Sequence, residues 1–334
     1  MPTLTEIRDD YSEQIAELER GTADSLTSDL KTDIESIHKY AMAQWIRRFG
    51  SLDNDPTPSG LKALLSDLKT KFGNLTFIDL DSLVDAMHEA AALGVGQNLD
   101  ELAELELTAA EKRGMAAAAA AGVSVDIDPS VINDTAQEKL DATRDKLIAR
   151  NVTDFESLFQ ILTGLNAMML EINRSTTTMI NAAASLGATH VAREVGGQLM
   201  WVSERGACLH CLAYAGQVVN PGEEFEGGRT FGDKPLSEAP LKGPPLHPFC
   251  RCRLSVWLGS REGVGPTEAP KALEREAWRT VLRGWSPYAS EPARLRAADG
   301  LIEQVEAQMP KSVIAVARRA IRDGEFTGPN PLLE

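Results

Sequence analysis

The residues of this sequence with the clearest chemical potential are cysteines and a histidine. All four cysteines fall in two short pairs, Cys208-x-x-Cys211 and Cys250-x-Cys252, and His247 lies three positions before the second pair. A Cys-x-x-Cys turn brings two thiolates within reach of one ion. On an extended segment Cys250 and Cys252 point to the same face, because strand side chains alternate. The spacing therefore predicts a tetrahedral, sulfur-rich metal site.

Zinc is the metal that this donor set favours, in a structural role. Soft thiolates with at most one imidazole suit zinc, and structural zinc sites are closed by four ligands. Five donors leave three roles for His247: it replaces one cysteine, it lies in a second shell, or it is an ordinary exposed histidine held by Pro248. We rank the four-cysteine set first. Two disulfides are the alternative, which the absence of a secretion signal disfavours.

Catalytic interpretations of the same residues fit the sequence less well. A zinc deaminase needs a His-x-Glu pair ahead of Pro-Cys-x-x-Cys, and a zincin needs His-Glu-x-x-His; neither pattern is present. A cysteine nucleophile would be Cys211 or Cys250 with His210 or His247 as its base. The Cys250-Arg-Cys252-Arg pattern is better explained as a ligand pair on a strand, so we predict no enzyme and no catalytic residues.

The charge distribution bears on nucleic-acid binding. The formal net charge is −15, and residues 1–150 alone carry 15 basic and 28 acidic side chains, a net charge of −13. General affinity for duplex DNA comes from lysine and arginine, so this balance argues against it. The alternative function that remains is a zinc-ribbon-like nucleic-acid adaptor. Its contacts would be Arg251, Arg253 and the C-terminal Arg318, Arg319 and Arg322, although a strand would turn Arg251 and Arg253 away from the cysteines.

Hydrophobic periodicity predicts an α+β chain with mostly helical N-terminal and C-terminal regions around a small β-containing module stapled by zinc. Helices are predicted over residues 3–50, 61–72, 79–93, 100–121, 129–150, 153–195 (broken near Gly164 and Gly187), 269–283, 295–308 and 312–322. Short strands are predicted at residues 198–202, 217–219 and 253–258.

Three consecutive regions organise the chain in this interpretation. Residues 1–150 form an acidic helical region, residues 151–260 contain the metal module, and residues 261–334 form a helical C-terminal region. No run approaches the length of about 18 apolar residues that a membrane span needs, and the first residues are polar and acidic. We therefore expect no membrane partner, and a cytoplasmic location unless an assembly carries the protein elsewhere.

The central region resembles a known family. The run Asn173-Arg-Ser-Thr, the segment Gln198–Trp201, Cys208-x-x-Cys211, Gly216-Gln-Val-Val and finally Pro244-Pro-Leu-His-Pro-Phe-Cys-Arg-Cys252 resemble the MuF-like family of phage minor head, or head morphogenesis, proteins. The resemblance covers roughly residues 150–260. Many relatives carry threonine or serine where this chain has Cys208 and Cys252, and an aspartate in the region of Ser203-Glu-Arg205.

The resemblance implies a structural function in the virion. Family members look like low-copy internal proteins of tailed-phage heads that associate with the portal and the scaffold during procapsid assembly, and some leave with the DNA at ejection. For this chain it implies the portal protein and the scaffold or major capsid proteins as partners, with packaged DNA as a further candidate. It also implies a location in the capsid interior near the portal, where the acidic region 1–150 would dock.

Overall fold

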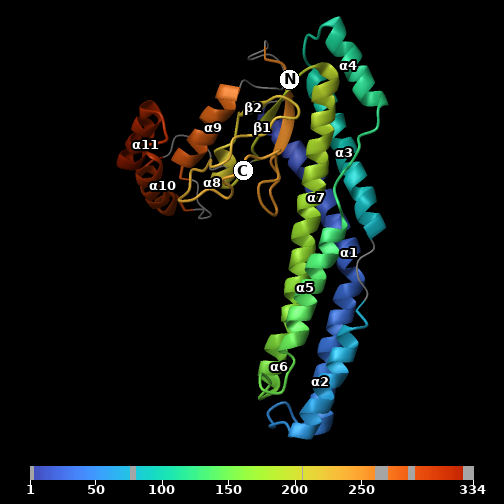
Figure 1. Cartoon of the computed structure of the whole chain (residues 1–334). Coiled ribbons are helices and arrows are strands. Elements are labelled where there is room, and N and C mark those ends of the chain that lie inside the picture. Colours follow the sequence, from blue (N-terminus) through green and yellow to red (C-terminus); the bar gives the residue numbers. More distant parts are fainter. Residues whose placement is uncertain (1–3, 76–79, 205, 260–269, 285–289, 326–334) are drawn as a thin grey trace. The chain divides into compact units, whose positions relative to one another are not determined.

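The fold combines many helices with one small sheet. The computed structural model describes residues 4–75, 80–204, 206–259, 270–284 and 290–325 (Figure 1). No helix in these ranges is both long and apolar enough to cross a membrane. The α+β class predicted from the sequence is confirmed at this level, because helices dominate and the strands form one antiparallel sheet.

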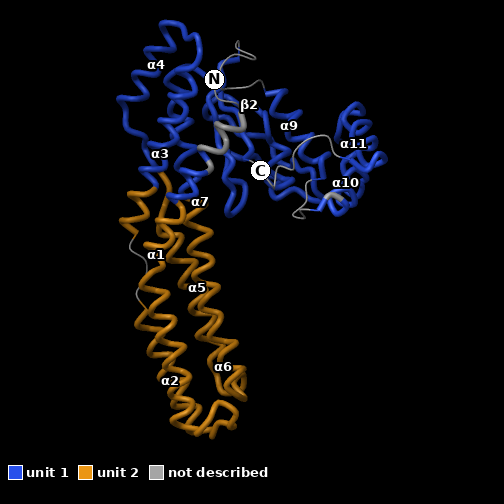
Figure 2. The backbone as a smooth tube through the Cα atoms, turned by 180° about the vertical axis from the view of Figure 1, so that it is seen from behind, with its two compact units in different colours: residues 1–18, 87–125, 180–334 blue, residues 19–86, 126–179 orange. Residues whose placement is uncertain are grey.

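The chain forms two compact units that are not consecutive in sequence (Figure 2). Unit 1 contains residues 1–18, 87–125 and 180–334, and unit 2 contains residues 19–86 and 126–179. Several long helices contribute to both units. The three consecutive regions inferred from the sequence stay a prediction about domain organisation, because compactness alone does not test them.

Unit 2 is entirely helical in its described part. It comprises most of α1 (Leu4–Phe49), α2 (Pro58–Phe72), the start of α3 (Leu80–Ala103), α5 (Ser130–Lys146), α6 (Phe155–Leu162) and the first half of α7 (Gly164–Val195). The buried Trp45 ring packs edge-on against Phe49 and Phe155, at 4.8 and 5.5 Å between ring centroids. A capping box between Asp154 and Ser157 begins α6.

In unit 1, the remaining part of α7 packs closely against the remaining part of α3 and against α4 (Ala109–Ala120). A Cβ atom at Gly94 would overlap the backbone of Ala184, and one at Gly187 would overlap the backbone of Ala91. Gly114 of α4 lies equally close to the backbone of Glu194. Glycine is therefore required at these three positions by the close approach of the helices.

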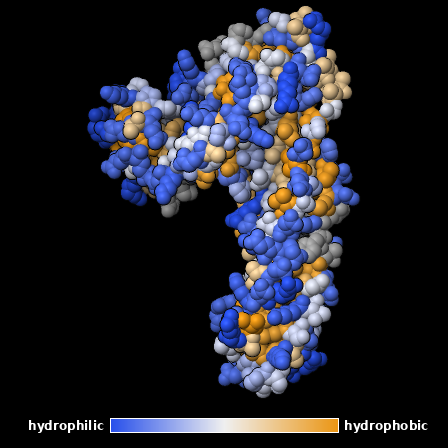
Figure 3. Space-filling model, viewed as in Figure 1, coloured by the Kyte–Doolittle hydropathy of each residue, from blue (hydrophilic) through white to orange (hydrophobic). Residues whose placement is uncertain are grey.

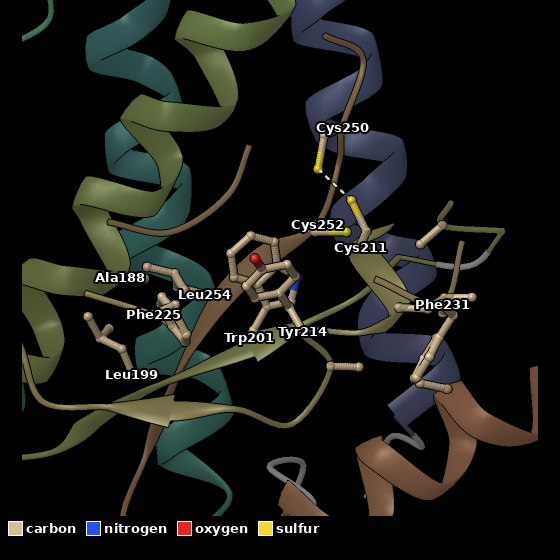
Figure 4. Close-up of a cluster of buried hydrophobic side chains, with 14 of the residues drawn as sticks. Ala188, Leu199, Trp201, Cys211, Tyr214, Phe225, Phe231, Cys250, Cys252 and Leu254 are labelled. Carbon is tan, nitrogen blue, oxygen red and sulfur yellow. Dashed lines mark hydrogen bonds between the residues drawn. The ribbon is translucent and has the colours of Figure 1, made fainter. Parts of the chain in front are cut away.

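The sheet of unit 1 is antiparallel and has the order β2-β1-β3. It consists of β1 (Gln198–Val202), β2 (Val218–Val219) and β3 (Arg253–Trp257), and Met200 lies opposite Ser255. One face packs Trp201 against Tyr214 and Phe225 in the main core (Figure 4). The other face places Met200 and Trp257 in a cluster with Leu273, so both faces are covered.

Four helices complete unit 1. They are the single turn α8 (Leu209–Leu212) and the C-terminal α9 (Pro270–Leu282), α10 (Glu291–Val305) and α11 (Lys311–Asp323). Gly324, with φ of +75°, ends α11 in the left-handed conformation that glycine adopts without strain. In the space-filling view, hydrophilic residues surround a smaller apolar area on the visible face of α10 and α11 (Figure 3).

Two of the predicted helix boundaries are wrong for physical reasons. The helix predicted over residues 100–121 is divided, because α3 continues to Ala103 and a capping box between Thr108 and Glu111 begins α4. The predicted break at Gly187 is also absent, and α7 runs through it to Val195. There the glycine permits contact between helices and does not end one. The break near Gly164 is confirmed, because α6 ends at Leu162.

The glycine contacts predict opposite effects for two neighbouring glycines of α3. Gly94→Ala forces α3 away from α7, and we expect it to lower the free energy of unfolding by about 1–3 kcal/mol, as overpacking does. Gly96 has no atom within 4 Å of an added Cβ. Gly96→Ala should therefore raise the stability by up to about 1 kcal/mol through helix propensity. Thermal unfolding followed by circular dichroism measures both; equal effects would contradict the packing explanation.

Candidate metal centre

Local structure around the two cysteine pairs positions all five candidate donors. Cys208 is the N-cap residue of α8, and Cys211 lies one turn later inside that helix. Cys250 and Cys252 lie on the extended segment that leads into β3 at Arg253. The helix turn and the strand both pack into the main core of unit 1, which brings the pairs together from distant parts of the sequence.

A tight turn places His247 beside the second pair. The Cys250 amide donates a hydrogen bond to the His247 carbonyl oxygen at 3.1 Å. Pro248 and Phe249 are the central residues, and Phe249 has φ of +62°. Proline followed by a left-handed residue is the pattern of a type II turn, in which glycine or asparagine usually takes the second place. A phenylalanine there costs about 1 kcal/mol or more.

The donor atoms lie at distances that suit a single ion. The Nε2 atom of His247 is 3.1 Å from the Cys208 sulfur and 3.2 Å from the Cys211 sulfur. The Cys211 and Cys250 sulfurs are 3.6 Å apart (Figure 4). With Zn–S bonds of about 2.3 Å, the edge of a regular tetrahedron is about 3.8 Å. The distances between these donor atoms are therefore close to the distances between ligand atoms that bind one metal ion.

The five donors form two overlapping groups. Cys208, Cys211 and His247 make one group, and Cys211, Cys250 and Cys252 make the other, with the ligand atoms of each group within 4.8 Å of one another. Cys211 belongs to both. The structure therefore brings the five metal ligands predicted from the sequence into two groups that share Cys211, and these groups could hold a metal ion.

Burial excludes water from most of the sulfur atoms. Cys211, Cys250 and Cys252 are at most 1% exposed, Cys208 is half-buried, and all four are free thiols. Thiols make only weak hydrogen bonds, so a buried group of them gains little from hydrogen bonding alone. A divalent cation bound to thiolates would satisfy all of them at once.

The pKa values within the cluster favour a charged pair, with a thiolate at Cys208 beside a protonated His247. A hydrogen bond from the Cys211 thiol, opposed by burial and assisted by His247, lowers the pKa of Cys208 to about 4. The hydrogen bond with Cys208 in turn raises the pKa of His247 to about 9. Burial raises the pKa of Cys252, whereas hydrogen bonds from Cys211 and Cys252 lower that of Cys250. Thiolates are thus stabilised at two positions, and thiolates are the form that binds metal.

Hydrogen bonds around the cluster orient its donors. The Nδ1 atom of His247 lies 2.7 Å from the Pro248 carbonyl oxygen. With Nδ1–H donated to this oxygen, Nε2 is the ring nitrogen that faces the sulfurs, and a metal ion would replace the proton that the raised pKa keeps there. The Ser203 hydroxyl donates to the Cys211 carbonyl oxygen at 2.9 Å. The Arg251 amide donates to Glu204 at 3.3 Å. The sequence had left the role of Ser203 and Glu204 open.

Arg253 has a different role from the phosphate contact considered above. It is 3% exposed and forms an ion pair with Glu101 of α3, and its guanidinium lies over the Tyr11 ring at 5.5 Å. Ser255 donates a second hydrogen bond to Glu101 at 2.6 Å. Arg253 is therefore buried and ion-paired, and it cannot reach a nucleic acid from this position. The role of Glu101 was missed, because it lies far away in the sequence.

The other histidine of the module lies outside the cluster. The Nδ1 atom of His210 is 2.9 Å from the Thr230 hydroxyl oxygen, and His210 belongs to neither donor group. It is also only half-buried. His210 therefore provides a matched control for the ligands on either side of it.

Comparisons of this chain with protein-family models, with curated proteins and with solved structures found no match. The geometry of the centre and the sequence motif are therefore the observations from which a function is inferred.

Metal content tests the centre directly. Cys211→Ser removes the donor common to both groups, and we expect the purified protein to lose at least 90% of about one equivalent of bound metal. His210→Ala keeps every donor and should retain the metal. Elemental analysis by mass spectrometry measures both variants after the same purification. Metal retained by Cys211→Ser at the level of the unchanged protein would contradict this assignment.

Proposed function

We propose that this chain is a structural protein of tailed-phage head assembly, in which a zinc ion staples the module that carries the family motif. The observation that carries the proposal is the convergence of Cys208, Cys211, His247 and Cys250 at ligand distances. Cys211, His247 and Cys250 lie in the segments that resemble the MuF-like motif, whereas many relatives replace Cys208 by threonine or serine. The motif supports the virion role, and the geometry supports the staple.

Zinc fits the donors better than other metals. Three thiolates and one imidazole give the Cys3His set of many structural zinc sites, whereas oxygen ligands, which magnesium and calcium prefer, are lacking among the grouped donors. We assign the ligands to Cys208, Cys211, His247 and Cys250, because sulfur–nitrogen and sulfur–sulfur distances of 3.1–3.6 Å connect these four side chains. The set of four cysteines, with His247 beside it, is the alternative.

The staple would stabilise the long segment between the two ligand pairs. Residues 212–249 contain little regular structure beyond β2 and an isolated bridge between Phe225 and Leu241. Leu212, Tyr214, Phe225 and Phe231 attach the segment to the core, and each is at most 5% exposed. A long irregular loop loses much entropy on folding, and an ion that joins its ends offsets part of that loss.

A closed centre supports a structural role over catalysis. Four protein ligands leave no position for an activated water, which a catalytic zinc site requires. Three of the four proposed ligands are cysteines, and Cys211 and Cys250 are fully buried. We therefore propose that the module shapes a surface for the portal and for the scaffold or major capsid proteins, as the resemblance implies.

Two single substitutions separate the proposed ligand set from the alternative. Cys250→Ser removes a ligand, and we expect it to weaken zinc binding by at least about 100-fold and to unfold the segment around residues 205–255. Cys252→Ser removes a buried thiol that is not a ligand, and zinc should be retained. Competition with a chromophoric chelator gives the affinities, and hydrogen exchange reports the local unfolding. The opposite order of the two affinities would favour the four-cysteine set.

The assembly role is tested in phage particles. We expect the unchanged protein and the His210→Ala variant to be present in purified procapsids or virions, at low copy number. The Cys211→Ser variant should be absent or strongly reduced, because its module is not held in shape. Quantitative mass spectrometry of gradient-purified particles measures all three. Absence of the unchanged protein from procapsids and virions alike would overturn the proposal.

A further inference from the structure

We propose that the solvent face of α9 binds single-stranded nucleic acid, with phosphates at Lys271, Arg275 and Arg279 and one base against Trp278. This site is separate from the metal centre, and it does not depend on the assembly role proposed above. It also differs from the arginines that the sequence suggested for a nucleic-acid contact.

The three basic residues form one ridge along α9. They recur at every fourth position, so they lie on one helix face and follow one another at a rise of about 6 Å. All three are exposed, and no carboxylate of the described residues forms an ion pair with any of them. Like charges at this spacing destabilise a helix slightly, so the arrangement is unfavourable without an anionic partner.

Three of the five arginines that the sequence suggested already form ion pairs. Arg253 is buried against Glu101. Arg318 pairs with Glu306 at 2.6 Å and Arg322 with Asp323 at 3.0 Å. The ridge on α9 is therefore more available to phosphate than these residues.

Trp278 lies between two grooves beside the ridge. The smaller groove has a volume of about 200 Å³, and Lys271, Arg275 and Trp278 line it together with residues of α11 and the segment before it. The larger groove, of about 360 Å³, is lined by Trp278 together with Arg229, Thr230 and Gln308. An edge-on contact with Phe231, at 5.8 Å between ring centroids, holds the indole in place.

A basic ridge beside a half-exposed aromatic ring matches the chemistry of a single strand. Proteins that bind single strands combine cations along the backbone with aromatic rings on which unpaired bases stack. A duplex would offer phosphates to the ridge, but its bases are stacked on each other and cannot reach Trp278. Glu274, which lines both grooves, adds an acceptor for the amino group of a base.

The acidity of the whole chain does not prevent such binding. Most of the negative charge belongs to residues 1–150, whereas residues 261–334 carry 11 basic and 11 acidic side chains. At physiological salt the charge of distant residues is screened over about 8 Å. The local balance at the ridge therefore decides the interaction.

Fluorescence anisotropy of the full-length protein with a labelled 12-nucleotide single strand tests the proposal at low salt. We expect the triple variant K271A/R275A/R279A to bind at least tenfold more weakly. For this variant, the slope of log affinity against log salt concentration should be shallower by about 2. Each phosphate contact with a single strand contributes about 0.7 to that slope, and the variant removes three contacts. The control K31A/K62A/K69A removes the same charge from exposed lysines of α1 and α2, and it should bind like the unchanged protein.

Variants at Trp278 test the stacking contact. Trp278→Ala should lose at least about fivefold in affinity, since stacking on one aromatic ring contributes this much or more. Trp278→Phe keeps an aromatic face and should retain most of the affinity, which separates loss of stacking from loss of folding. A duplex of the same length should bind more weakly than the single strand.

Four results would overturn the proposal. These are no binding of the strand at low salt, an equal loss in the two triple variants, an unchanged affinity in Trp278→Ala, and equal affinity for strand and duplex. Vesicles that contain phosphatidylserine are tested in parallel. Binding to the vesicles without binding to the strand would assign the ridge to a membrane surface instead.

Discussion

The β-containing module of unit 1 depends on the meeting of its two cysteine pairs in the core. Cys211 lies in both donor groups, within 3.6 Å of Cys250 and 3.2 Å of the His247 ring. The helix turn that ends near Cys211 and the segment that leads into β3 are thereby joined. Between them runs a segment with little regular secondary structure, which is also held by the pairing of β2, the Phe225–Leu241 bridge and buried aromatic side chains. A metal ion at the cysteine pairs would join the two ends of that segment.

A second interaction connects the sheet to the helices. The carboxylate of Glu101 receives both the Arg253 guanidinium and the Ser255 hydroxyl, and Asn98 one turn earlier accepts the Val256 amide at 2.8 Å. Removing one partner from a buried ion pair commonly costs about 3–5 kcal/mol, because the other charge remains without a counterpart. Strand β3 is therefore joined to α3, while the residues before it carry two of the candidate sulfur ligands.

The features that the sequence could predict were mainly those set by residues close together in the chain or by ligand chemistry. Strand Gln198–Val202 was predicted at its observed bounds, because apolar residues and flanking glycines define it locally. The convergence of the cysteines was predictable, because ligand chemistry requires it. Glu101 gave no such signal, since an acidic residue on a helix usually faces solvent. The ridge on α9 was visible as spacing, but its lack of ion pairs and the position of Trp278 between two grooves required the structure.

The glycine contacts in unit 1 have a mechanical consequence. Gly94 and Gly187 each meet the backbone of the opposite helix, on α7 and α3 respectively. If one helix slid along the other by one turn, a residue with a side chain would take the place of a glycine and collide with that backbone. The glycines thus fix the register of α3 against α7. Such a helix pair resists axial displacement of one helix past the other, so the two helices would move along the axis together.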